Sequence, residues 1–144
     1  MTIYNKVATL SKINAAYIAG IIDGEGTITL TSKHKNANRQ LAITISNTEM
    51  PLLEFIIETI QAGKITHKKT YKKNHTPSMT YAISNRQALD LLSQISPYLK
   101  TYKKQRAELI LKDYVRVTPR NGKYNENLKT EREKFIEAFF EITP

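Results

Sequence analysis

The spacing of apolar and polar residues changes several times along the 144-residue chain. Between Ser11, which has the side chain of a helix N-cap, and Gly24, apolar residues recur every three or four positions, which predicts a helix ending at a glycine-rich turn. Apolar and polar residues then alternate in two segments, residues 27–33 and 40–46, separated by a polar turn at residues 35–38. This part of the chain is therefore predicted to form a helix followed by a β-hairpin.

The same order then repeats. A wide apolar stripe between Pro51 and Ile60 predicts a second helix, which Gly63 is expected to end. Beyond it, alternating residues on either side of a turn at residues 74–77 predict a second hairpin. The sequence therefore contains two predicted hairpins, each preceded by a helix.

The remainder of the chain is predicted to be helical. Ser84 begins a capping box at the start of one helix, and another helix is expected over about residues 101–117. Residues 119–127 have the composition of a loop, and a final helix is expected to open with a capping box at Thr130 and to cover about residues 130–142. This order predicts a single α+β domain spanning the whole chain, in which helices back an antiparallel four-stranded sheet.

The charged residues are distributed unevenly. The net charge is +9, yet neither residues 26–48 nor residues 59–89 contain an Asp or a Glu, and the acidic residues lie mainly in the predicted helices. A basic surface that served solubility alone would mix the two signs, so nucleic acid is favoured as a polyanionic partner. An acidic membrane surface fits less well, because the basic segments are predicted strands and not amphipathic helices.

Each predicted hairpin has an aliphatic face and a polar face. The aliphatic face can pack on helices, and the Thr, Ser, Gln and Lys side chains of the other face can bind base edges and phosphates. An ordinary solvated sheet face is the alternative, which the absence of acidic residues disfavours. The positions expected to contact DNA are Thr29, Thr31, Lys33, Arg39, Gln40, Ala42, Thr44, Ser46, Thr66, Lys68, Thr70, Lys72, Ser78, Thr80 and Ala82.

No feature of the sequence indicates secretion or membrane insertion. The chain has no Cys, its N-terminal segment does not resemble a signal peptide, and no apolar run is long enough to span a bilayer. We therefore expect an intracellular protein without a membrane partner. An organelle and a bacterial or phage cytoplasm fit this expectation equally well.

The end of the first predicted helix departs from the usual placement of charge. Asp23 and Glu25 lie where exposed carbonyls already carry partial negative charge, and such conflicts are more frequent at functional sites than elsewhere. Ala16, Gly20 and Gly24 recur every fourth residue, so one helix face is almost bare backbone. If a second copy of the chain packed on this face, the two Glu25 side chains would lie close together.

This segment also carries a family resemblance. The sequence Ile18-Ala19-Gly20-Ile21-Ile22-Asp23-Gly24-Glu25-Gly26 resembles the signature of the LAGLIDADG homing endonucleases, with Ile for Leu, Gly for Ala and Glu for the final Asp. Residues 45–55 resemble the second strand and following helix of that family, and residues 97–106 resemble its basic segment. The resemblance covers about residues 12–117, and the C-terminal helix is less diagnostic.

The resemblance implies a saddle-shaped sheet that binds double-stranded DNA. Because the chain has one copy of the motif, it implies a homodimer, and twofold symmetry then implies a pseudo-palindromic target. The implied activity is metal-dependent cleavage of both strands with short 3′ overhangs, in the manner of intron homing. Mg²⁺ is the expected cofactor, and Mn²⁺ or Ca²⁺ could occupy the same site.

The candidate catalytic residues follow from the chemistry of phosphodiester hydrolysis. This reaction requires a positioned water and neutralisation of charge on the phosphate, which divalent cations held by carboxylates provide. Mg²⁺ needs only one or two protein carboxylates, so Glu25 is the first choice as metal ligand and catalytic residue, with the Gly24 carbonyl beside it. Asp23 is expected to cap a helix or bridge to a partner helix, and a second metal ligand is the alternative.

Two further roles are assigned by resemblance alone. Lys103 corresponds to a basic residue near the cleaved phosphate, with Lys104 as the fallback, and Asn47 corresponds to a polar residue that orders active-site water. The basic run that contains Lys103 would also suit binding of the DNA backbone.

The main alternative is a protein of the same fold that binds nucleic acid without cleaving it. An intron RNA maturase or a transcription regulator belongs to this class, and intron RNA would be the partner of a maturase. A structural basic protein is a third class. It would give no reason for the Gly24-Glu25-Gly26 turn or for the acid-free hairpins.

Overall fold

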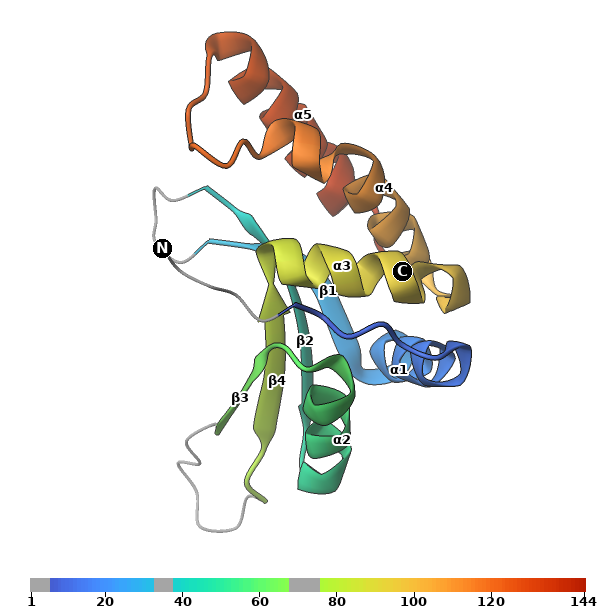
Figure 1. Cartoon of the computed structure of the whole chain (residues 1–144). Coiled ribbons are helices and arrows are strands. Elements are labelled where there is room, and N and C mark those ends of the chain that lie inside the picture. Colours follow the sequence, from blue (N-terminus) through green and yellow to red (C-terminus); the bar gives the residue numbers. More distant parts are fainter. Residues whose placement is uncertain (1–5, 33–37, 68–75) are drawn as a thin grey trace.

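Figure 1 shows the computed structural model of the chain, in which residues 6–32, 38–67 and 76–144 are described. The elements are α1 (Lys12–Glu25), β1 (Gly26–Thr31), β2 (Gln40–Asn47), α2 (Met50–Ile60), β3 (Lys64–His67), β4 (Met79–Ser84), α3 (Asn85–Ile95), the short 3₁₀ helix η1 (Ser96–Tyr98), α4 (Tyr102–Val117) and α5 (Glu126–Glu141). The strands form one antiparallel sheet in the order β1-β2-β4-β3, which confirms the predicted α+β fold. None of the helices in the described ranges is long and apolar enough to cross a membrane.

The strand register separates the residues of the sheet into two faces. Two adjacent rows illustrate the separation, Ile28-Ile43-Ile83 on one face and Thr27-Thr44-Ala82-Lys64 on the other. The isoleucines are at most 2% exposed, because α1, α2 and α3 pack on their side of the sheet (Figure 1). The polar row belongs to the face turned away from these helices, as the alternation in the sequence predicts.

Helix α1 is apolar on two faces. Ile18 and Ile22 are fully buried and contribute to the core between α1 and the sheet. Ile13 and Tyr17 lie on the other side of the helix and are 81% and 51% exposed. The periodicity that predicts this helix therefore combines a core face with a second apolar face at the surface.

Helix α5 begins four residues earlier than predicted. Its N-cap is Asn125, whose side chain accepts a hydrogen bond from the Leu128 N–H (2.7 Å), and the helix starts at Glu126. Thr130, the predicted cap, lies inside the helix and donates its hydroxyl to the Glu126 carbonyl (2.9 Å). Asn and Thr are both good caps, and the sequence alone does not distinguish two cap residues five positions apart.

Gly63 has a steric function beyond the end of α2. The helix itself ends at Ile60, not at Gly63 as predicted, and its C-cap is Gln61, which has a left-handed conformation (φ 63°). Gly63 has a φ of 96°, and a Cβ atom here would lie 2.6 Å from the side chain of Tyr81. Tyr81 is fully buried and donates its hydroxyl to the Ala62 carbonyl (2.7 Å). Burial raises the pKa of Tyr81 far above its usual value, so the hydroxyl remains a donor.

Replacing Tyr81 with Phe should destabilise the fold. The Tyr81→Phe variant keeps the ring but leaves the buried Ala62 carbonyl without its donor, at a cost of about 1–3 kcal/mol in the free energy of unfolding. Urea denaturation measures this loss. The control is Tyr98→Phe, whose hydroxyl has no hydrogen-bond partner among the described residues, and equal losses in both variants would contradict the assigned role.

Candidate functional site

Helix α1 passes directly into β1 at Gly26. The Gly26 N–H donates to the Ile22 carbonyl and closes the last turn of the helix. Gly26 is buried, and a Cβ atom at this position would lie 2.8 Å from the Cα atom of Ile22. A glycine is therefore required for the helix to end against the first strand, and Glu25 is left at the junction.

Lys103, in the first turn of α4, caps the end of α1. Its Nζ donates to the Ile22 carbonyl (2.7 Å) and to the Asp23 carbonyl (2.9 Å), and the residue is only 8% exposed. A cation is favourable at a helix C-terminus, where the free carbonyls carry partial negative charge. Desolvation lowers the pKa of Lys103, Asp23 opposes this shift, and Arg106 adds to it. Two of the three ammonium protons are engaged, and one remains for a further acceptor.

Asp23 makes the reciprocal contact with the start of α4. Its carboxylate accepts hydrogen bonds from the Lys100 N–H (2.7 Å), the Thr101 N–H (3.3 Å) and the Thr101 hydroxyl (2.6 Å). Thr101 is in turn the N-cap of α4 and accepts from the Lys103 N–H. Asp23 thus links the last turn of α1 to the turn that positions Lys103.

Glu25 and Asn47 lie together although they are 22 positions apart. The Asn47 Nδ2 atom donates to Glu25 Oε2 (2.6 Å), and Asn47 Oδ1 accepts from the Glu49 N–H (2.8 Å). The Glu49 N–H requires an acceptor, so it fixes which end of the amide faces Glu25. Asn47 therefore orients the carboxylate, whose remaining lone pairs are available to another ligand.

The donor set at this site suits a hard divalent cation. Glu25 is exposed, and its carboxylate and the neighbouring Gly24 carbonyl are oxygen ligands of the type that Mg²⁺ and Ca²⁺ prefer. The described ranges contain no cluster of three or more acidic, His or Cys side chains. A cation bound here would therefore take most of its ligands from water and substrate, which is typical of Mg²⁺.

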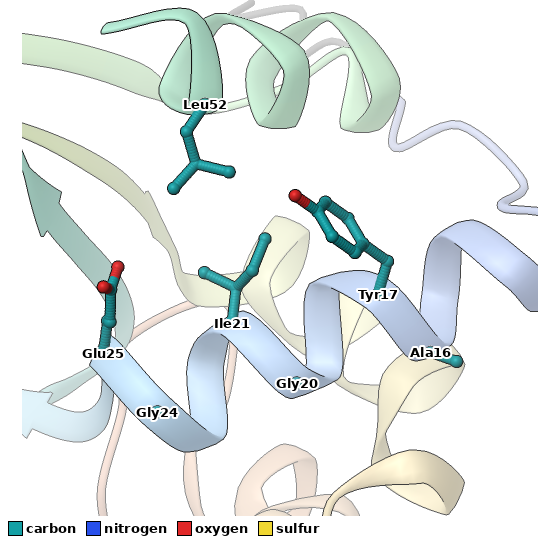
Figure 2. A pocket seen from close by; sticks show the side chains of 7 residues that line it. All are labelled: Ala16, Tyr17, Gly20, Ile21, Gly24, Glu25 and Leu52. Atoms are coloured by element: carbon teal, nitrogen blue, oxygen red, sulfur yellow. The ribbon is translucent and has the colours of Figure 1, made fainter. Parts of the chain in front are cut away.

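An open hollow follows the exposed side of α1. Figure 2 shows Tyr17, Ile21 and Glu25 pointing from α1 into the hollow, with Leu52 of α2 pointing into it from the opposite side. Its lining consists of Ala16, Tyr17, Gly20, Ile21, Gly24, Glu25 and Leu52. A Cβ atom at Gly20 or Gly24 would meet no atom within 4 Å, so packing within the chain does not require glycine at either position.

The exposed apolar surface is wider than the sequence predicts. Besides Ala16, Gly20 and Gly24, it includes Ile13 and Tyr17, and the Tyr17 ring packs edge-on against Phe55 of α2, with 5.5 Å between the ring centroids. Phe55 is expected to be core by its periodicity but is 36% exposed. The signal that could have identified these residues is the apolar character of α1 on both of its faces.

The polar face of the sheet collects most of the predicted DNA-contacting residues. It carries Thr29, Thr31, Gln40, Ala42, Thr44, Ser46, Thr66, Thr80 and Ala82. The hydroxyls of Ser46 and Thr80 are hydrogen-bonded across the strands (2.8 Å), and Ser78 directly precedes β4. Lys33, Lys68, Thr70 and Lys72 lie outside the described residues.

Arg39 has a different environment from the other predicted DNA contacts. Its guanidinium donates to the Leu30 carbonyl (3.0 Å) and lies over the ring of Phe140 in α5, 5.1 Å from the centroid. The side chain therefore contacts both β1 and the C-terminal helix α5.

A sequence model described as LAGLIDADG endonuclease matches residues 18–116, more than half of the chain. The chain belongs to the LAGLIDADG endonuclease family. The predicted family and the predicted class of activity, a site-specific DNA endonuclease, are thereby confirmed. The family match ends within α4, so α5 lies beyond it. No curated protein sequence matches the chain.

Solved structures of LAGLIDADG endonucleases share the fold. The homing endonuclease I-CvuI in complex with its target has a TM-score of 0.71 and 17% identity, over 92% of this chain and 83% of that chain. The archaeal intron-encoded I-Vdi141I complexed with DNA has a TM-score of 0.69 and 16% identity, over 92% and 85%. The meganuclease I-SmaMI bound to DNA has a TM-score of 0.65 and 17% identity, over 90% of this chain but only 44% of that chain.

Asp23 and Glu25 should differ in their effect on stability. Asp23→Ala removes the acceptor for three donors at the start of α4 and should cost about 1–2 kcal/mol in the free energy of unfolding. Glu25→Ala removes an exposed acid from a helix C-terminus, where it is unfavourable, and should change stability by no more than about 0.5 kcal/mol. Urea denaturation at one fixed protein concentration compares the two variants, and a loss of equal size in both would contradict this division of roles.

Proposed function

We propose that the protein is a homodimer that cleaves both strands of a DNA target in a divalent-cation-dependent reaction, with Glu25 of each copy at a scissile phosphate. The observation that carries the proposal is the convergence at the end of α1. Glu25, Asn47 from β2 and Lys103 from α4 meet there, between the open apolar face of the helix and the polar face of the sheet.

The open face of α1 supports the homodimer. Gly20 and Gly24 each cost about 1 kcal/mol of helix stability relative to Ala, and no close contact with the described residues offsets that cost. A second α1 packed on this bare face would need the close backbone approach that glycine allows. It would also cover Ile13 and Tyr17. I-SmaMI, of which this chain covers less than half, is long enough to hold two such units in one polypeptide.

The roles of the site residues follow from their contacts. Glu25 and the Gly24 carbonyl would hold a divalent cation, and Mg²⁺, or Mn²⁺ or Ca²⁺ in its place, fits this donor set. When bound, the cation supplies charge neutralisation at the phosphate and activation of water. Asn47 holds the Glu25 carboxylate in place, and the free N–H of Lys103 can donate to a phosphate oxygen. Asp23 is assigned to the capping of α4.

The polar face of the sheet is proposed to read the DNA. Its Thr, Ser and Gln side chains carry donors and acceptors for base edges in the major groove, and the strands contain no carboxylate that would repel phosphates. The named relatives have been seen with DNA, one I-CvuI complex in the presence of Ca²⁺ and another in the presence of Mg²⁺. Twofold symmetry of the dimer would require a pseudo-palindromic target. The family resemblance further implies that cutting at the two Glu25 sites leaves short 3′ overhangs.

The homodimer can be tested at Gly20. Gly20→Leu should raise the dimer dissociation constant by about 30- to 1,000-fold, which corresponds to about 2–4 kcal/mol, because the side chain would separate the two α1 helices. The Cβ atom of the new side chain would meet no atom of the described residues within 4 Å, and Gly20 lies on the exposed side of α1, so the monomer should stay folded. Sedimentation equilibrium measures the mass, with Ala138→Leu on the exposed surface of α5 as the matched control. A Gly20→Leu protein that remains dimeric like the control would contradict the proposed interface.

The cleavage site can be tested at Glu25. Selection of cut and of bound molecules from a randomised pseudo-palindromic duplex library, with Mg²⁺ and then with EDTA, identifies the target. On that target Glu25→Gln should lower the cleavage rate by at least about 100-fold and leave binding nearly unchanged, because the amide is a poorer cation ligand. Glu108→Gln, an exposed acid on α4, is the control and should cut normally.

The same selection separates the rival functions. Cleavage by Glu25→Gln at the wild-type rate would refute the site assignment. Sequence-specific binding by the wild type without any cut product would favour a regulator, and preferential selection of RNA in a parallel pool would favour a maturase.

A further inference from the structure

The end of the β1–β2 hairpin extends beyond the rest of the sheet. Pairing between β2 and β4 stops at Ala42 and Ser84, whereas pairing between β1 and β2 continues to Thr31 and Gln40. This end is therefore a two-stranded ribbon, and such ribbons are only marginally stable in water without support from other elements.

Tyr114 of α4 supports the ribbon where β4 has ended. Its hydroxyl accepts a hydrogen bond from the Leu41 N–H (3.1 Å) and donates to Asn85 Oδ1 (3.0 Å) at the start of α3. Tyr114 is 1% exposed, so these contacts are made inside the core. The first paired residues of β2 are thereby fixed to two helices.

Arg132 of α5 makes a second contact, with the residue that directly precedes the same strand. The side chain is 7% exposed, and its Nη2 atom donates to the Arg39 carbonyl. Its Nη1 atom donates to the Val117 carbonyl at the end of α4 (3.3 Å) and to the Tyr124 hydroxyl. These acceptors are neutral, so among the described residues the buried charge is balanced by dipoles and by the Tyr124 ring, whose centroid lies 5.4 Å from the guanidinium carbon. A buried cation is costly unless its hydrogen bonds are well satisfied.

The support extends to both strands of the ribbon. Arg39 lies over Phe140 of α5 and donates to the Leu30 carbonyl of β1. Arg106 donates to the Ile28 carbonyl of β1 (2.9 Å) and to the Ile142 carbonyl just after α5 (2.9 Å). These contacts reach main-chain atoms of the hairpin. They leave the polar side chains on the opposite face of the sheet unobstructed.

We propose that Arg132 is a positioning residue for DNA recognition, because it fixes the direction of the β1–β2 ribbon and so the base contacts of Thr31 and Gln40. This inference rests on the proposed reading of DNA by the polar face of the sheet. It assigns a role to α5, which lies beyond the family match. A small rotation of the ribbon would move its polar side chains away from their bases, while β3 and β4 would keep theirs.

The test compares Arg132→Met with Arg116→Met. Arg116 is a control of the same residue type, because its side chain is 51% exposed and forms surface ion pairs with Asp113 and Glu131. Base preference at every position of the half-site is measured by selecting bound duplexes from a library, without Mg²⁺ so that binding alone is scored. Gln40→Ala and Thr66→Ala identify the positions read by β1–β2 and by β3–β4.

Arg132→Met should reduce base discrimination about 10-fold at the positions that depend on Gln40 and leave those that depend on Thr66 unchanged. Hydrogen exchange of the Leu41 amide should also become at least 10-fold faster than in Arg116→Met. If Arg132→Met does not fold, Phe140→Ala replaces it, since Phe140 is 39% exposed and its loss weakens the same support.

Two outcomes would overturn the inference. An unchanged preference profile, or a uniform loss at all positions that accompanies a lower melting temperature, would reduce Arg132 to a general stabilising residue. If the wild-type protein selects no duplex, the proposed function itself is refuted. If the wild type is selective and Arg132→Met has the same base preference, only this inference is refuted.

Discussion

The reciprocal capping of α1 and α4 is the contact on which the site depends. Lys103 donates to the carbonyls at the end of α1, and Asp23 accepts from the amides at the start of α4. Each charge therefore lies at the helix end whose dipole favours it, the cation at a C-terminus and the anion at an N-terminus. Because both contacts involve the last turn of α1, they also fix the position of Glu25, which lies two residues beyond Asp23. Within α1 alone, Asp23 places a negative charge at a helix C-terminus, where it is unfavourable. Its hydrogen bonds to the start of α4 resolve this conflict.

Helix α1 combines three functions, and its sequence reflects all three. One face packs Ile18 and Ile22 in the core, the opposite face exposes glycines and Ile13, and the end carries the carboxylate. A helix that served the core alone would have polar residues on its outer side and alanine in place of Gly20. This combination ties the distance between the two active sites of the proposed dimer to the packing of the helices that carry them. A change in that packing would alter stability and cleavage geometry together.

Local patterns in the sequence predict the helices and strands. The contacts of the site residues depend on partners that are far away in the chain. The period of two in β1 and β2 and the period of 3.6 in α1 are local properties, and the structure agrees with both. The partners of Asp23 are 77 and 78 positions away, and no local rule identifies them. Two good caps lie close together near the start of α5, so the local pattern predicts a start at Thr130 whereas the helix begins at Glu126. Family resemblance points to Lys103, and the contact of this side chain with α1 explains why Lys103, and not Lys104, is buried.

Net charge is a weaker guide to the DNA-binding surface than the distribution of carboxylates. Several basic side chains donate to main-chain carbonyls of the same chain, namely Arg39, Arg86, Lys103, Arg106 and Arg132. Their hydrogen bonds hold strands and helix ends in place, so the +9 of the sequence is not a count of cations free to bind phosphates, and Lys103 keeps one N–H for such a contact. In the described residues, by contrast, none of the four strands contains Asp or Glu. A face that approaches a polyanion must above all exclude like charge, and this condition is met along the whole polar side of the sheet.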